Sequence, residues 1–268
     1  MGNIYVSALL SMTGLAVFFA AVLAFADKKL KVEDDPKVSA ITDLLPGVNC
    51  GACGFLSCHD FAEHLTAREV DPGKCRVMTE DHRKKIYDIM GEKEKDTYPR
   101  IPLVRCAAEC SQKEPEADYT GIATCAAAEL VFGGGMKCTY GCTGYGDCAA
   151  VCPFGALHME NGLPRLDAEK CTGCAKCAGA CPRNVINMQD KRNEKIFYVA
   201  CSSQDDMIRT RKICSAGCIA CGVCVKLSGD GLFKIENNLA QADYSKQRNA
   251  DTLLSIAAKC PTKVIKET

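Results

Sequence analysis

The chain opens with an apolar run that contains no charged residue and extends from Ile4 to Ala26. As a helix with a rise of about 1.5 Å per residue, this run is about 34 Å long, enough to cross a bilayer. Lysines follow it at once, at Lys28, Lys29 and Lys31. Because basic residues favour the cytoplasmic side, residues 1–26 are predicted to form a single-pass anchor in the inner (cytoplasmic) membrane, with the later domains in the cytoplasm. A cleaved signal peptide is the alternative, although the residues before the run lack the usual positive charge.

The pattern changes after a charged linker at 27–36, and a small helical module is predicted over 37–97. Its first helix is indicated by apolar residues at helical spacing, namely Val38, Ile41, Leu44 and Leu45. A second apolar helical stretch lies near Phe61 and Leu65. The segment 83–96 is rich in both charges, which predicts a solvated helix or a linker.

From residue 98 onward the pattern is that of short strands, and it repeats. The runs "IPLVRC" (101–106) and "IFYVAC" (196–201) both have β character and both end in cysteine. Each is followed by a cysteine ladder and by a hairpin signal, Asn161-Gly162 in the first copy and Asn237-Asn238 in the second. We therefore predict two related α+β modules, at 98–194 and 195–268.

The composition indicates that these small modules need disulfides or bound metal for stability. The chain has 268 residues and 21 cysteines but no tryptophan and only 6% aromatic residues, so large apolar cores are not available. In a reducing cytoplasm the cysteines are better suited to metal binding than to disulfides. Lys plus Arg equals Asp plus Glu, at 33 each, so nothing in the charge favours nucleic acid as a partner.

The ladder "CTGCAKCAGACP" is the most specific motif. Its cysteines, Cys171, Cys174, Cys177 and Cys181, have the C-x2-C-x2-C-x3-C-P spacing of bacterial two-cluster ferredoxins. In such proteins three cysteines bind one [4Fe–4S] cluster, and the cysteine before proline binds the other. Zinc is the alternative, although zinc sites usually take two separated pairs of ligands.

The stretch "CTYGCTGYGDCAAVCPF" supplies the partner half, with one irregularity. Cys152 precedes a proline and is predicted to complete the cluster of Cys171, Cys174 and Cys177. Cys181 is predicted to complete the other cluster, together with Cys142 and Cys148. Tyr145 stands where the fourth cysteine belongs, and Cys138 is predicted to replace it, with glycines at 141, 144 and 146 giving the chain its freedom. A site that lacks one ligand is the alternative.

The last module keeps one complete set of ligands. Cys218, Cys221 and Cys224 form a C-x2-C-x2-C ladder, and Cys260 precedes a proline. The crossed position after this ladder is Ser228, which agrees with the loss of a second cluster. One cluster is therefore predicted in 195–268.

The first module carries four cysteines within 26 residues, at Cys50, Cys53, Cys58 and Cys75. They predict a [4Fe–4S] cluster, with zinc as the alternative because this spacing is less diagnostic. Five cysteines remain, and four of them could hold a further cluster; buried unligated thiols are the alternative. These five are Cys106, Cys110, Cys125, Cys201 and Cys214. The sequence thus predicts four [4Fe–4S] clusters, or five if the remaining cysteines hold another, in an α+β chain of small iron–sulfur modules behind one transmembrane helix.

The chain resembles the B subunits of Rnf complexes, which are membrane-bound, ion-translocating ferredoxin–NAD oxidoreductases. The resemblance covers nearly the whole chain and rests on the order of its parts: the uncharged helix, "GVNCGACGFLSCHDFAEHL" with the later "DPGKC", and the two ladders quoted above. It implies that soluble ferredoxin donates electrons to this chain. It also implies that the chain passes them to membrane subunits carrying flavin and iron–sulfur centres, that they reach NAD, and that Na+ or H+ is moved outward.

The residues limit the part of this work that the chain itself performs. No G-x-G-x-x-G follows a predicted strand, so no catalytic NAD site is expected on this chain. The predicted span carries no charge that could form an ion path. His59 and His64 lack the spacing of cluster ligands and are interpreted as structural. The prediction is an electron relay with no catalytic residue; the alternatives are a membrane-anchored polyferredoxin that serves another redox enzyme or a redox-sensor reducing system, and a zinc-stabilised scaffold.

Overall fold

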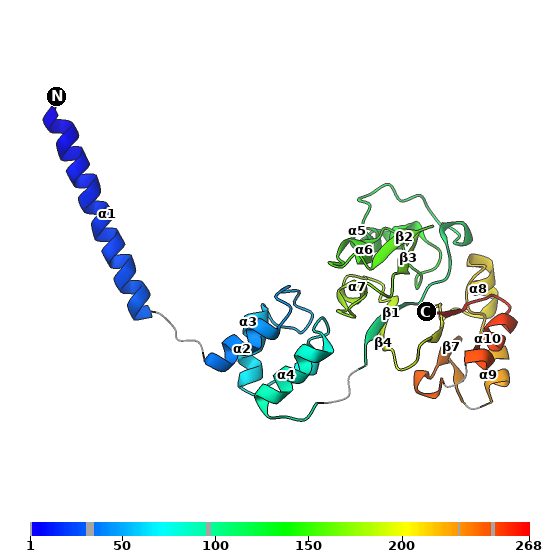
Figure 1. Ribbon diagram of the computed structural model, residues 1–268. Helices are drawn as coiled ribbons and strands as arrows, with labels where there is room; N and C mark the ends of the chain where they lie inside the picture. The colour runs from blue at the N-terminus through cyan, green and yellow to red at the C-terminus, as the bar shows by residue number, and fades with distance from the viewer. Residues whose placement is uncertain (1, 31–34, 95–97, 230, 248–249) are drawn as a thin grey trace.

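A long N-terminal helix is followed by three small modules (Figure 1). The computed structural model describes residues 2–30, 35–94, 98–229, 231–247 and 250–268. The described residues therefore leave out 31–34, which include Lys31 and lie in the expected linker at 27–36. They also leave out residues 95–97. The chain is a mixture of helices and short strands with an apolar helix at its start, which confirms the predicted fold class.

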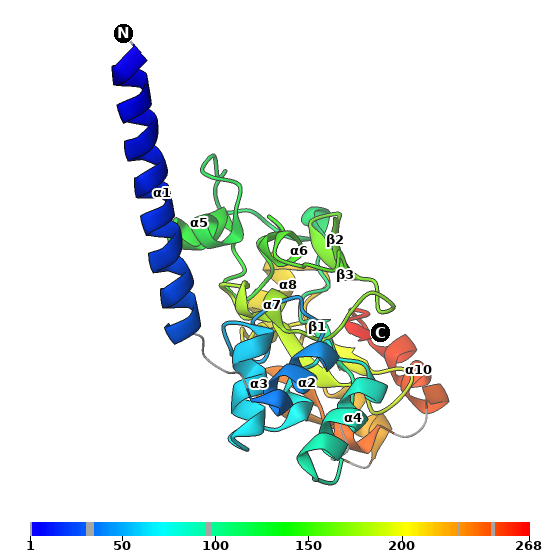
Figure 2. The ribbon, with the colours of Figure 1, turned by 60° about the vertical axis from the view of Figure 1, so that its left-hand side comes forward.

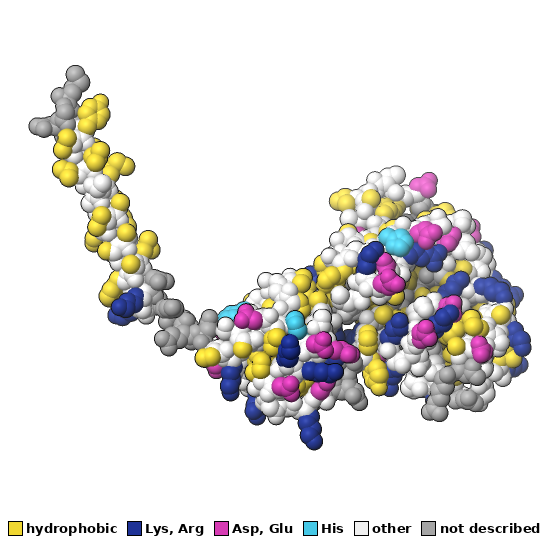
Figure 3. Space-filling model, in the orientation of Figure 1, with side chains coloured by type: hydrophobic (Ala, Val, Ile, Leu, Met, Phe, Trp, Pro, Cys, Tyr) yellow, Lys and Arg dark blue, Asp and Glu magenta, His cyan; other side chains and the backbone are white. Residues whose placement is uncertain are grey.

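Helix α1 (Gly2–Leu30) projects away from the modules (Figure 1), and its apolar side chains are visible along its length (Figure 3). Its segment Ala8–Ala26 is long and apolar enough to cross a membrane, and none of that segment is buried against the protein. Lys28 and Lys29 stand in its last turn. The exposed apolar surface is what a helix surrounded by lipid presents, since lipid takes the place of a protein core.

The first module consists of three short helices and one 3-10 turn. Its elements are α2 (Pro36–Leu44), α3 (Cys58–Thr66), η1 (Pro72–Lys74) and α4 (Glu80–Met90). At the start of each α-helix, a polar side chain accepts a hydrogen bond from a backbone N–H of the first turn. These side chains belong to Asp35 (α2), Ser57 (α3) and Thr79 (α4). The three helices share one core with Cys75 at its edge.

Helix α4 differs from the expectation of a solvated helix or linker at 83–96. Ile86 and Tyr87 are only 0% and 1% exposed, and Met90 is buried one turn later. The charged residues occupy the opposite face, so the segment is amphipathic rather than fully solvated. The helix ends at Gly91, whose left-handed backbone (φ 69°) suits glycine.

The second module is built on two antiparallel strand pairs. Strand β1 (Arg100–Val104) pairs with β4 (Ile186–Asp190), and between them the chain forms the hairpin β2–β3. The remaining elements are η2 (Cys110–Gln112), α5 (Cys125–Leu130), η3 (Phe132–Gly135), α6 (Asp147–Ala150), β2 (Leu157–Glu160), β3 (Leu163–Leu166) and α7 (Lys176–Gly179).

The third module repeats this nested arrangement. Strand β5 (Phe197–Val199) pairs with β8 (Ile265–Glu267) and encloses the hairpin β6–β7. Its other elements are α8 (Met207–Ile213), α9 (Val223–Ser228), β6 (Phe233–Glu236), β7 (Leu239–Ala242), η4 (Tyr244–Lys246) and α10 (Ala250–Lys259). In both views the second and third modules lie side by side, with β1 and β4 beside the C-terminal strand (Figures 1 and 2).

Both hairpins turn at the residues that the sequence indicated. Asn161 and Gly162 have φ values of 50° and 73°, and Asn237 and Asn238 have φ values of 49° and 59°. Two consecutive residues with positive φ define the turn that matches the twist of an antiparallel pair, and asparagine and glycine tolerate it best. The turns fix the register Glu160↔Leu163 and Glu236↔Leu239.

Candidate metal centres

The regular ladder and its crossed cysteine surround one cavity. Cys152, Cys171, Cys174 and Cys177 all line it, as the sequence predicted for one cluster. The backbone N–H groups of Gly173 and Ala178 donate to the sulfurs of Cys171 and Cys177. Such N–H donors stabilise thiolate ligands, so the cavity suits a cluster that is held by four sulfurs.

The backbone of this ladder follows from its small residues. Gly173 has a φ of 71°, and a Cβ there would lie 2.4 Å from the carbonyl oxygen of Arg100. Glycine is therefore required both for the turn and for the close approach to β1. Ala175 also has positive φ, at 64°, directly before α7. The two turns curl the ladder around the cavity.

The last module presents a second cavity of the same kind. Cys218, Cys221, Cys224 and Cys260 line it together, again as the sequence predicted. Burial raises the pKa of the Cys224 thiol to about 11, and the other three sulfurs add to the rise. Ser228, at the crossed position, donates its hydroxyl hydrogen to the Val225 carbonyl at 3.2 Å, which satisfies it within α9.

In the first module, Cys53, Cys58 and Cys75 approach one another closely enough for the first two to raise the pKa of Cys75. Burial is the larger cause of that rise. The backbone N–H groups of Val77 and Met78 donate to the Cys75 sulfur. Cys58 begins α3, and its N–H donates to the Asn49 side chain at 2.8 Å. Cys50, the fourth predicted ligand, lies in the same loop as Asn49 and Cys53.

The irregular ladder is completed differently from the expectation. The third cavity is lined by Cys142, Cys148 and Cys181, as predicted, but its fourth cysteine is Cys125 and not Cys138. Cys125 also appears among the groups that raise the pKa values of Cys142 and Cys148. Spacing along the chain places Cys125 only among the candidates for a fifth cluster.

Asp147 is the physical reason for this arrangement. Its carboxylate accepts the backbone N–H of Cys125 at 2.9 Å and that of Ala126 at 3.0 Å, which holds the start of α5 beside Cys148. Tyr145 does not enter the cavity wall, and its ring packs edge-on against Tyr119 at 5.7 Å between centroids. The signal that could have indicated this is the acidic residue directly before Cys148, which is suited to capping a second short helix.

Cys138 instead lines a further cavity, together with Cys106, Cys201 and Cys214. These four cysteines thus line one cavity although they belong to no common sequence motif. Cys110 is exposed and stands apart from these cavities, with its sulfur beside Gly162 of the β2–β3 turn.

Burial and neighbouring sulfurs disfavour the thiolate form in these cavities unless a positive charge is bound. Burial raises the pKa of the Cys142 thiol to about 12 and that of Cys148 and Cys177 to about 11, and neighbouring thiols raise all three further. Thiolates packed in this way repel one another, and bound iron supplies the positive charge that offsets the repulsion. Among the described residues, no three Cys, His, Asp or Glu side chains are placed to hold a single metal ion.

Two parts of the chain match families of iron–sulfur proteins. The family model "Putative Fe-S cluster" matches residues 45–77, and the model "4Fe-4S binding domain" matches residues 164–187. The chain is 37% identical to the B subunit of the proton-translocating ferredoxin:NAD+ oxidoreductase complex of Clostridium ljungdahlii, over 98% of this chain and 93% of that protein. It is 32% identical to the B subunit of the ion-translocating oxidoreductase complex of Methanosarcina acetivorans, over 99% of each. The chain belongs to the family of Rnf B subunits.

Membership of this family confirms the resemblance drawn from the motifs. The two family models confirm that iron–sulfur cluster domains are present, of the [4Fe–4S] type at 164–187. A third relative, the B subunit of the Na+-translocating ferredoxin:NAD+ oxidoreductase complex of Acetobacterium woodii, is 35% identical over 93% of this chain and 74% of that protein. These relatives are named for different ions, one for protons and one for Na+.

Proposed function

We propose that this chain is the electron-relay subunit of an ion-translocating ferredoxin–NAD oxidoreductase. It accepts electrons from reduced soluble ferredoxin and passes them to the flavin- and iron–sulfur-bearing membrane subunits of the complex. The observation that carries the proposal is the set of cavities lined by four cysteines each, in a chain with one helix that can cross a membrane. The names of the relatives support the same activity.

Each cluster site has a defined set of ligands in this proposal. A bound [4Fe–4S] cluster supplies reversible one-electron chemistry, and the thiolates hold it while their N–H donors tune its potential. The four sets are Cys50, Cys53, Cys58 and Cys75; Cys125, Cys142, Cys148 and Cys181; Cys152, Cys171, Cys174 and Cys177; and Cys218, Cys221, Cys224 and Cys260.

The strand pairing supports the division of the chain into domains. We assign 1–26 to the anchor, 27–36 to a linker, 37–97 to the first cluster domain, 98–194 to the two-cluster ferredoxin-like domain and 195–268 to the degenerate ferredoxin-like domain. The structure narrows the linker, because α1 continues to Leu30 and α2 begins at Pro36. Strands β1 and β4 lie near the two ends of 98–194 and pair with each other. Strands β5 and β8 do the same for 195–268. The lysines after the apolar helix favour a cytoplasmic location for the cluster domains, where soluble ferredoxin is found.

A direct test is the reduction of the full chain by ferredoxin. The protein is purified anaerobically in detergent and mixed with reduced ferredoxin, and bleaching of its visible cluster absorbance is followed in time. We expect rapid bleaching, and slower or smaller bleaching in Cys174→Ala, which removes a ligand of the regular ladder. Oxidised ferredoxin is the control. No bleaching of a fully loaded chain would contradict ferredoxin as the donor.

Partner identity is tested separately by purifying the tagged full chain from its native membrane in mild detergent. We expect flavin-bearing membrane subunits to co-purify with it. Recovery of the chain with a different redox enzyme would favour the polyferredoxin alternative. Zinc without acid-labile sulfide would favour the scaffold.

A further inference from the structure

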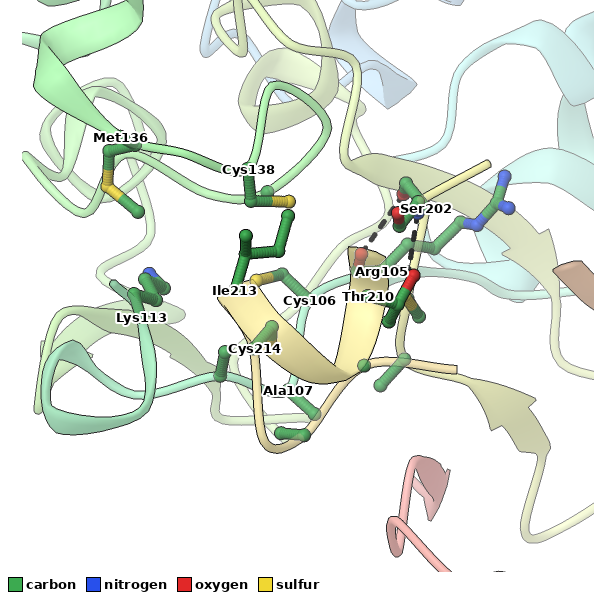
Figure 4. Close-up of a pocket in the computed structure, with 17 residues that line it drawn as sticks. Arg105, Cys106, Ala107, Lys113, Met136, Cys138, Ser202, Thr210, Ile213 and Cys214 are labelled. Atoms are coloured by element: carbon green, nitrogen blue, oxygen red, sulfur yellow. Dashed lines mark hydrogen bonds between the residues drawn. The ribbon is translucent and has the colours of Figure 1, made fainter. Parts of the chain in front are cut away.

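Four cysteines from four separate segments line one cavity between the second and third modules. Cys106 follows β1 and Cys138 precedes the irregular ladder, whereas Cys201 follows β5 and Cys214 follows α8. Each module therefore contributes two of the four. Figure 4 shows Cys106, Cys138 and Cys214 around the cavity, on distinct stretches of chain. Cys201 is buried, and the other three are half-buried.

Gly141 shows how close two of these sulfurs are. A Cβ at this position would lie 3.3 Å from the Cys138 sulfur and 3.7 Å from the Cys106 sulfur, so the two sulfurs are at most the sum of these distances apart. The backbone of Gly141 does not have the positive φ that would itself demand glycine. Glycine at 141 is therefore explained by the two nearby sulfurs, which a larger side chain would crowd, and not by the requirements of a turn.

Backbone N–H groups point at three of the four sulfurs. Cys138 receives donors from Tyr140 and Gly141, and Cys214 receives donors from Ala216 and Gly217. Cys201 accepts the N–H of Ser203 at 3.4 Å and also that of Cys218. The same kind of donor is found at Cys171 and Cys177 of the regular ladder, and it stabilises sulfur that carries negative charge.

The two modules are held in register at the cavity by contacts of their own. The Ser202 hydroxyl donates to the Arg105 carbonyl at 3.0 Å, and the Glu114 N–H donates to the Ile213 carbonyl at 3.3 Å. Lys113 and Cys214 form an isolated β-bridge. The four thiols are thus brought together by the fold itself, as a preformed site requires.

We propose that this cavity binds an additional [4Fe–4S] cluster through Cys106, Cys138, Cys201 and Cys214. The inference rests on the proposed function, because it uses the same chemistry, and it raises the number of clusters to five. The Arg183 guanidinium lies close enough to Cys138 to lower the pKa of its thiol, although burial raises that pKa more, and so favours the charged form that a cluster ligand takes.

The position of the site gives it a role between the two ferredoxin-like modules. Cys138 stands four residues before Cys142 of the irregular ladder. On the other side, Cys201 accepts a hydrogen bond from the N–H of Cys218, a ligand in the last module. An electron can then cross between modules in two steps. In each step one site is oxidised by one electron and its neighbour is reduced by one, with no bond broken and no proton moved.

The experiment compares Cys214→Ala with Cys110→Ala in the full chain, purified anaerobically in detergent. Iron, sulfide and zinc are measured per chain, and the reduced protein is examined by electron paramagnetic resonance. With four iron ions per cluster, we expect about 20 iron ions in the wild type, about 16 in Cys214→Ala and about 20 in Cys110→Ala. Cys214→Ala should also lose one component of the resonance signal.

Gly141→Val provides a second variant if Cys214→Ala does not fold, because it retains every thiol and its backbone conformation accepts a side chain. It should also lose about four iron ions, since its side chain occupies the space between two sulfurs. Full iron and an unchanged signal in both variants would overturn the fifth site. So would about 16 iron ions in the wild type, with or without one zinc ion, but that result leaves the proposed relay intact. A wild type without iron and sulfide would overturn the proposed function itself.

Discussion

Replacing Arg183 should destabilise the cysteine sites although Arg183 is not a ligand. The side chain is 3% exposed and follows Cys181 by two residues. Its Nη1 donates to the carbonyl oxygens of Cys138 and Gly141, each at 2.9 Å, and its Nη2 donates to that of Gly133 at 2.7 Å. Its Nε pairs with the Glu129 carboxylate. One guanidinium thus ties the Cys138 loop to the end of the regular ladder.

The size of the effect depends on which of these contacts dominates. A hydrogen bond from a charged donor contributes about 1.5–3 kcal/mol, and three that share one side chain are not additive. Loss of the guanidinium leaves three carbonyl oxygens without this donor, and should therefore cost about 3–5 kcal/mol. Glu129 is 36% exposed, so its ion pair with Arg183 is screened and contributes only about 0–1 kcal/mol.

The assay is the rate at which an iron chelator strips the anaerobic full chain. If the loop must open for release, Arg183→Met should accelerate release about 100-fold or more, because each 1.4 kcal/mol is about a factor of ten. Glu129→Gln should stay within about five-fold of the wild type, which corresponds to about 1 kcal/mol. Arg183→Lys should fall between them, since an ammonium cannot reach three carbonyls in a fork. Equal acceleration by Glu129→Gln and Arg183→Met would refute the reasoning.

Three further outcomes are expected. Cys125→Ala should lower the iron content by about four ions per chain, and adding Tyr145→Cys should restore it by recreating the regular ladder; unchanged iron in the single variant would contradict the Cys125 assignment. Ile86→Ala should reduce stability by about 2–5 kcal/mol and lower the midpoint of anaerobic thermal unfolding, whereas the exposed Ile89→Ala is the control and should change it little; equal effects would be inconsistent with a buried face on α4. Asn161→Ala should cost about 1–2 kcal/mol in the same measurement, because alanine disfavours the left-handed backbone of that turn, and no loss would exclude a strained turn.

Local features of the fold could be predicted from the sequence because they depend on neighbouring residues. The two hairpins turn at asparagine-containing pairs, and positive φ at both positions is a property of those residues themselves. Helix α2 is similarly indicated by its apolar spacing and by the proline after it. For α4 the signal was present but masked, since Ile86 and Met90 lie four residues apart within a strongly charged segment.

Some cysteine sites likewise depend on neighbouring residues, whereas others depend on contacts between distant parts of the chain. The regular ladder and the ladder at 218–224 curl around their cavities through local turns, so spacing along the chain predicts which cysteines line each cavity. Cys125 rather than Cys138 lines the third cavity because the Asp147 carboxylate accepts the Cys125 N–H from 22 residues away. The spacing of cysteines along the chain does not predict that contact. The cavity that Cys138 does line depends on two modules being packed together.

This difference has a consequence for how the chain becomes loaded. A ladder presents three thiols on a short loop, so its cluster can bind as soon as one module has folded. The cavity of Cys106, Cys138, Cys201 and Cys214 exists only when the second and third modules are docked. A cofactor that binds only the docked arrangement must stabilise that arrangement by its own binding free energy. The cluster that relays electrons between the modules is then also the link that holds them at the distance over which the electrons pass.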